Sequence, residues 1–142
     1  MSSPERLTIK LLQEVVYSGA RFNVDGTPLE SRSKVNFWGK GVLRRYTFYQ
    51  FCLEKLVASS PGAQVEMLLL LGFFRLDSSP EKAPKIVNTM VMVAKSLKAP
   101  SGLINAVLRQ YLKRRERLES SATGDRSLRY SIPQGLLDKV AK

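Results

Sequence analysis

The stretch PSGLINAVLRQYLKRRERL, from Pro100 to Leu118, has two distinct faces when it is read at helical spacing. Its basic residues Arg109, Lys113 and Arg117 follow one another at steps of four, which places them in a row on one side of a helix. Its apolar residues recur every three or four positions on another side, as in a helix packed on a core, and they are Leu103, Ile104, Val107, Leu108, Tyr111, Leu112 and Leu118. We therefore predict one helix that serves both a hydrophobic core and an anionic partner.

The composition is that of one basic globular domain. The chain has 142 residues, of which 44% are hydrophobic and 25% are charged, and this is enough for one ordinary domain with a core. Lys and Arg total 23 against 12 Asp and Glu, which gives a net charge of +11. Such an excess attracts polyanions, so we expect RNA or DNA as a partner; the alternative is charge that only promotes solubility.

Several kinds of chemistry lack the residues they need. The sequence has no histidine and one cysteine, which argues against His-dependent catalytic triads, His/Cys zinc sites and an intrachain disulfide. Cys52 lies between apolar residues, so we predict a buried and unreactive thiol. The glycine motifs that cradle phosphates, GxxxxGK[ST] and GxGxxG, are absent. We therefore expect no catalytic, metal or cofactor site in this chain.

Neither a membrane span nor a secretory signal is visible. The longest apolar run, MLLLLGFF from Met67 to Phe74, is much shorter than the roughly 20 residues that cross a bilayer. The first ten residues, MSSPERLTIK, lack the apolar segment of a secretory signal. We expect a cytoplasmic protein with no membrane partner.

The rest of the chain also shows helical periodicity, and no segment alternates as a strand would. A cap and proline at Ser3-Pro4 start a first helix, residues 19–33 are predicted to be a loop, and residues 35–56 are predicted to be one long helix. A central helix follows Ser60-Pro61, apolar on nearly all sides, and an amphipathic helix covers residues 86–97. The prediction is an all-α bundle of about five helices.

Smaller features within these helices are predicted to serve packing. Gly39, Gly41 and Gly72 lie inside helical segments, where they would allow a neighbour to approach closely. Met90 and Met92 are interpreted as core residues. The aromatic residues of the long second helix are also interpreted as core, although base stacking is the alternative, and they are Tyr46, Phe48, Tyr49 and Phe51.

The helical pattern stops after Leu118. The polar stretch ESSATGDRSLRY predicts a linker, and IPQGLLDKVAK restarts an apolar pattern that predicts the beginning of another helix. The expected organisation is a helical domain over residues 1–118, followed over residues 119–142 by a linker and the first element of another region.

Four words of the sequence, in this order, resemble the NusB antitermination-factor fold: GVLRRY at 41–46, LLLGFFRLDSSP at 69–80, IVNTMVMVAKSL at 86–97 and GLINAVLRQ at 102–110. They are more similar to the NusB-like N-terminal domain of the bacterial ribosomal RNA cytosine-5 methyltransferases, the Sun/Fmu family. The resemblance covers roughly residues 5–118. The tail, YSIPQGLLDKVAK at 130–142, is similar to the segment that joins this domain to the methyltransferase part.

The resemblance implies an all-helical, non-catalytic RNA-binding domain that positions 16S ribosomal RNA for methylation. Methyltransferases of the family use S-adenosylmethionine and two cysteines, whereas this sequence has no Pro-Cys motif and no glycine-rich cofactor loop. S-adenosylmethionine would therefore be a cofactor of a full-length parent enzyme and not of this chain. One alternative is a free-standing NusB-type antitermination factor that binds RNA with a ribosomal protein. Another is a protein-interaction module that docks an acidic protein or its own methyltransferase domain.

The predicted RNA contacts are basic residues of three helical segments. They would bind phosphates, which position an RNA without reading its sequence. For Arg44 and Arg109, each at the end of an apolar word, a structural ion pair or a helix-end contact is the alternative. The predicted contacts are Arg109, Lys113, Arg114 and Arg117, then Lys40, Arg44 and Arg45, and finally Arg6 and Lys10.

Overall fold

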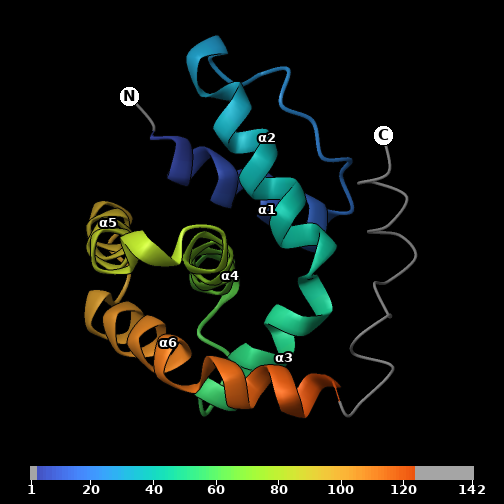
Figure 1. Ribbon diagram of the computed structural model, residues 1–142. Coiled ribbons are helices and arrows are strands. Elements are labelled where there is room, and N and C mark those ends of the chain that lie inside the picture. Colours follow the sequence, from blue (N-terminus) through green and yellow to red (C-terminus); the bar gives the residue numbers. More distant parts are fainter. Residues whose placement is uncertain (1–2, 124–142) are drawn as a thin grey trace.

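Six α-helices and one short 3-10 helix make up the computed structural model, which describes residues 3–123 and contains no strand in that range (Figure 1). The all-α prediction is confirmed. The second half of the expected linker and the expected C-terminal helix lie outside the described residues. The elements are α1 Pro4–Ser18, α2 Leu29–Arg44, α3 Tyr46–Leu56, α4 Ala63–Ser78, η1 Pro80–Lys82, α5 Ala83–Ser96 and α6 Ser101–Thr123.

Helix α1 begins and ends with the signals that its sequence carries. The Ser3 hydroxyl accepts a hydrogen bond from the backbone N–H of Arg6 at 3.2 Å, and Pro4 occupies the first turn. Gly19 adopts a left-handed conformation with φ of 71° and donates its N–H to the Glu14 carbonyl. Both ends of α1 therefore satisfy backbone groups that would otherwise have no partner.

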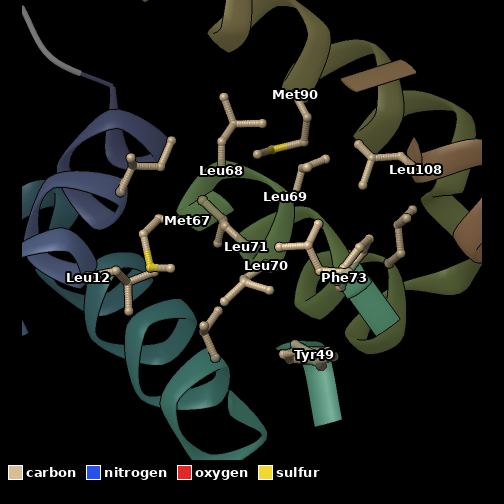
Figure 2. Packing of buried hydrophobic residues seen from close by; sticks show 14 of the residues in the cluster. Leu12, Tyr49, Met67, Leu68, Leu69, Leu70, Leu71, Phe73, Met90 and Leu108 are labelled. Carbon is tan, nitrogen blue, oxygen red and sulfur yellow. The ribbon is translucent and has the colours of Figure 1, made fainter. Parts of the chain in front are cut away.

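Helix α4 is the centre of the bundle, as predicted. It packs against α1, α2, α3, α5 and α6, and its residues 67–71 are completely buried. Figure 2 shows that its side chains spread in all directions, with Met67 on the side of Leu12 in α1 and Leu69 on the side of Met90 in α5. The middle of α4 has neighbours on every side, which explains the apolar run from Met67 to Phe74.

Close packing explains Gly39, Gly41 and Gly72, the three glycines inside helices α2 and α4. A Cβ atom on Gly39 would collide with the ring of Phe22. A Cβ atom on Gly72 would lie 2.7 Å from Cδ2 of Leu108, so the absence of a side chain lets α6 approach α4. A Cβ atom on Gly41 in α2 would collide with the ring of Phe74 in α4. The predicted role in close approach is confirmed at all three positions.

The segment 35–56 is not one helix, and the loop before it is shorter than predicted. Arg45 interrupts the segment with φ of −113° and ψ of 22°, so that α2 ends at Arg44 and α3 begins at Tyr46. The apolar periodicity continues across the break because both helices face α4. Helix α2 also begins within the predicted loop, at Leu29, whose side chain is 77% exposed and so adds nothing to an apolar pattern.

The last helix is longer than its apolar pattern predicts. Helix α6 continues past Leu118 to Thr123, and Leu118 and Ala122 are both buried against the core. Two residues that were predicted to be in the core are instead at the surface: Met92 is 57% exposed and Leu112 is 38% exposed. Both lie at the edge of an amphipathic pattern, where spacing alone does not separate core from boundary.

The predicted core positions are confirmed for Cys52 and for two of the four aromatic residues of α3. Cys52 is fully buried, and burial raises the pKa of its thiol to about 12, so the thiol stays protonated near neutral pH. Phe48 and Tyr49 belong to the core, while Tyr46 and Phe51 are half-buried. Within residues 3–123, none of the helices is both long and apolar enough to cross a membrane.

Candidate functional site

A row of three cations lies on the outer side of α6. Arg109, Lys113 and Arg117 are exposed, whereas Leu108 and Tyr111 on the same helix are fully buried. The Arg109 Nε donates a hydrogen bond to the Asn105 Oδ1 at 2.9 Å, which fixes that side chain along the helix. We call Arg109, Lys113 and Arg117 the basic row. Among residues 3–123, no carboxylate lies within ion-pair distance of the basic row.

Arg45, which was also predicted to bind RNA, is engaged inside the protein. Its guanidinium lies 3.4 Å from the Asp77 carboxylate and 3.4 Å from the Glu119 carboxylate. The same guanidinium lies 4.5 Å above the centre of the Phe48 ring. Arg45 therefore joins the start of α3 to the end of α4 and the last turns of α6. The preceding residue, Arg44, is exposed.

These contacts are part of a polar cluster around Asp77, which the sequence did not reveal. The hydroxyl groups of Tyr49 and Tyr111 donate to the Asp77 carboxylate at 2.9 Å and 2.8 Å. The Arg115 guanidinium donates to Asp77 at 2.7 Å and to Glu119 at 2.6 Å. We call this group the Asp77 cluster, and its members are Arg45, Tyr49, Asp77, Tyr111, Arg115 and Glu119.

The surroundings of the Asp77 cluster keep its tyrosines neutral. Burial, together with the nearby Asp77 charge, raises the pKa of Tyr49 and of Tyr111 well above the ordinary value of 10.0. Each hydroxyl can therefore act as a hydrogen-bond donor to the carboxylate over the whole physiological pH range. The Asp77 cluster holds α6 against α3 and α4, and it presents the basic row on a fixed helix.

The other predicted RNA contacts are distributed over separate faces. Arg114 is half-buried beside the basic row, and Lys40 is half-buried in α2, one turn before the exposed Arg44. Arg6 and Lys10 lie on α1, which packs mainly against α2 and α4. Figure 1 shows α1 on the far side of α4 from α6. The structure therefore brings the α6 cations together and does not bring the α1 pair to them.

A groove of about 490 Å³ runs between α5 and α6, next to the basic row. Arg109 belongs to both features. The floor is apolar, amide groups and a hydroxyl lie along it, and the charged lining residues are Lys95 and Arg109. The lining residues are Ala83, Pro84, Val87, Asn88, Val91 and Lys95 from α5, and Ser101, Gly102, Asn105, Arg109 and Leu112 from α6.

The described residues do not gather a metal site. In the range 3–123, no three His, Cys, Asp or Glu side chains are placed so that they could share an ion. The acidic side chains of the Asp77 cluster are instead paired with two arginines. The surface of α6 also carries the exposed carboxylate of Glu116, but the basic row and the groove lining are made of cations, amides and apolar side chains, which suit binding of an anion.

The chain matches no protein-family model. It is 33% identical over 105 residues to the ribosomal RNA small subunit methyltransferase B of Serratia proteamaculans (strain 568). The aligned part makes up 70% of this chain but 24% of that protein, so the chain spans about a quarter of the length of the relative that it matches. The chain is therefore similar to one part of a ribosomal RNA methyltransferase.

Proposed function

We propose that this chain is a non-catalytic, NusB-like RNA-binding domain that positions ribosomal RNA for a cytosine-5 methyltransferase. The observation that carries the proposal is the basic row on α6, which is exposed and has no carboxylate partner among residues 3–123. The similarity to a ribosomal RNA methyltransferase supports RNA as the anion. S-adenosylmethionine and the catalytic cysteines would belong to another part of the full-length protein, which would act in the cytoplasm.

The basic row suits a phosphate backbone because it is regular and rigid. Residues four apart on a helix are separated by about 6 Å along its axis, so the three cations form a line about 12 Å long. The Asp77 cluster fixes α6 to two other helices, and so little conformational entropy is lost when an RNA binds. Arg114, beside the basic row, would assist, whereas Lys40 and Arg44 on α2 and Arg6 and Lys10 on α1 would contact only an RNA that extends beyond α6.

A charge reversal tests the assignment of the basic row. The variant Arg109→Glu, Lys113→Glu, Arg117→Glu should weaken binding of a labelled small-subunit ribosomal RNA transcript by roughly 100-fold or more. It should also reduce the slope of log K against log salt by about 2–3, because about one phosphate contact is lost with each cation. The measurement is fluorescence anisotropy over a range of salt concentrations.

A matched variant controls for total charge. The changes Arg21→Glu, Lys34→Glu and Lys55→Glu remove the same charge from exposed positions outside the predicted RNA contacts. Exposed charges are screened within about 8 Å at physiological salt, so this control should bind within about threefold of the parent. Equal weakening by both variants, or no salt-dependent binding by the parent chain, would exclude the basic row as an RNA site.

A further inference from the structure

The groove lies open between α5 and α6, which pack against each other and both line it. Residues 97–100 join the helices, so Lys95 and Gly102 lie at the end near this connection. Arg109 and Leu112 lie at the other end, beside Ala83 at the start of α5. Seven residues of helix separate Gly102 from Arg109, which makes the groove about 10 Å long. Its volume of about 490 Å³ lies in the range of about 300–1,000 Å³ that is typical of small-molecule pockets.

Positive charge marks both ends of this groove. Lys95 is exposed at one end and Arg109 at the other, and no carboxylate is among the lining residues. The end near Lys95 also contains the first turn of α6, where backbone N–H groups of Ser101 and Gly102 precede the first intrahelical acceptor. A ligand that lies along the groove would therefore meet a cation at each end.

The middle of the groove differs from its ends. Val87 and Val91 provide an apolar floor, and the side-chain amides of Asn88 and Asn105 lie along it. An unpaired nucleobase has an apolar face and a polar edge that both donates and accepts hydrogen bonds. The aliphatic floor of the groove matches the apolar face of a base, and the side-chain amides match its polar edge. A paired base inside a duplex exposes neither property to a groove of this size.

We propose that this groove binds an unpaired nucleotide of a single-stranded RNA segment, with the base over Val87 and Val91 and the flanking phosphates near Lys95 and Arg109. This inference rests on the proposed function, because Arg109 is shared between the groove and the basic row. A strand whose backbone follows the basic row along α6 reaches the groove at Arg109. The chain would thus distinguish a single-stranded or looped RNA from a continuous duplex.

A bulky substitution in the floor tests this proposal. Val91→Trp fills the groove without changing any charge, and Met92→Trp is the matched control, because Met92 is exposed on the same helix but does not line the groove. Val91→Trp should weaken binding of a mixed-sequence single-stranded RNA by about 10-fold or more, since burial of one base against the apolar floor is lost. Its affinity for a duplex of the same sequence should change less than about twofold, and Met92→Trp should change neither affinity.

Protection of an introduced cysteine gives a second measurement that does not depend on the tryptophan. The native Cys52 is buried, so a thiol reagent at neutral pH modifies an introduced surface cysteine selectively. The cysteine of the Asn88→Cys variant would lie in the groove lining, whereas the cysteine of the Met92→Cys variant would lie outside it. Saturating single-stranded RNA should slow alkylation at position 88 by about fivefold or more and leave position 92 unchanged. Circular dichroism of each variant would establish that the helices are retained.

The outcomes separate the two proposals. If the parent binds RNA through the basic row but Val91→Trp binds single strands as well as the parent does, and position 88 is not protected, the groove does not take a nucleotide. That result would leave the basic row in place and would favour a protein segment as the occupant of the groove. If the parent chain binds neither single-stranded nor duplex RNA, the proposed function and the groove assignment both fail.

Discussion

Asp77 occupies a position where a carboxylate is ordinarily unfavourable. It is the second-to-last residue of α4, at the negative end of the helix dipole, and its side chain is 12% exposed. Two guanidinium groups and two hydroxyl groups compensate for this location. Asp77 is therefore an acceptor on which groups from three other parts of the chain depend.

Removal of this acceptor should destabilise the fold strongly. Asp77→Ala leaves the Tyr49 and Tyr111 hydroxyls and the Arg115 guanidinium without their main acceptor, so we expect the free energy of unfolding to fall by about 3 kcal/mol. Chemical denaturation with urea measures the change. Asp25→Ala, at an exposed turn, is the control and should stay within about 0.5 kcal/mol of the parent. A similar small change for Asp77→Ala would mean that the Asp77 cluster does not hold α6.

The Asp77 cluster also shows what sequence reasoning can miss at the level of single residues. A structural ion pair was considered for Arg44 and Arg109, but among residues 3–123 the ion pairs near α6 are made by Arg45 and Arg115. The helix break at Arg45 rotates its side chain toward Asp77, and periodicity does not predict such a break. Asp77 precedes two serines and a proline, a sequence typical of a turn, so nothing in the pattern marks it as a buried acceptor.

Among the elements, α4 and α6 depend on one close contact. Gly72→Ala adds a helix former to α4, which alone would stabilise by about 1 kcal/mol, but the added Cβ would lie 2.7 Å from Leu108. In the parent we expect a net loss of about 1–2 kcal/mol from overpacking. In a Leu108→Ala background, which has room for the methyl group, the same change should stabilise the protein.

A double-mutant cycle, measured by thermal or urea unfolding, would show whether the effect of Gly72→Ala on the free energy of unfolding changes sign between the two backgrounds. Gly102→Ala is the control, because nothing lies within 4 Å of its added Cβ, and its effect should be the same in both backgrounds. A Gly72→Ala effect that does not depend on residue 108 would mean that α6 does not pack on α4 at this point.

The apolar periodicity of the sequence predicts most of the helices. It does not predict a helix boundary where the last turns of the helix consist of exposed residues. The start of α1 follows from its cap and proline, and the apolar face of α6 follows from spacing, whereas α4 begins at Ala63 after Gly62 and not at the Ser60-Pro61 signal. The start of α2 at Leu29 and the end of α6 at Thr123 lie in polar sequence, where no apolar pattern marks the helix. The residues of the basic row could be predicted because their spacing alone places them on one side of α6.

At the scale of the whole molecule, buried weak acids determine the response to alkaline pH. Burial raises the pKa of Tyr49 and Tyr111 above their ordinary value of 10.0, and it raises the pKa of Cys52 from 9.0 to about 12. The folded protein therefore retains protons that the unfolded chain releases. Stability from these groups is complete below about pH 9 and is lost as the pH rises above 9–10.

Above about pH 9–10, Tyr49, Tyr111 and Cys52 should each lower the free energy of unfolding by up to about 1.4 kcal/mol per pH unit. Urea unfolding at pH values from about 8 to about 11 measures this decline. Tyr111→Phe removes one of the three groups and should make the decline less steep, although it also lowers stability at neutral pH. A free energy of unfolding that stays constant up to about pH 11 would contradict the burial of these groups.

The groove between α5 and α6 could not be predicted from the sequence, because it exists only where two helices meet. Val87, Val91 and Leu112 all belong to apolar patterns that predict core, and the structure places Leu112 partly at the surface. Lys95 and Arg109 belong to different helices and line one groove because α5 and α6 pack against each other. The apolar periodicity of a single helix does not predict a groove that forms between two helices.

The Asp77 cluster has a further consequence for the order of events on the ribosome. Its members extend from Arg45 to Glu119, so Asp77 leaves the exit tunnel well before the arginine and tyrosine of α6 that it will bind. Until those residues follow, α4 lacks a neighbour and its terminal carboxylate lacks half of its partners. A nascent chain of which only the residues up to about 100 have left the exit tunnel should therefore be open to proteases, and it should become protected once α6 has also emerged.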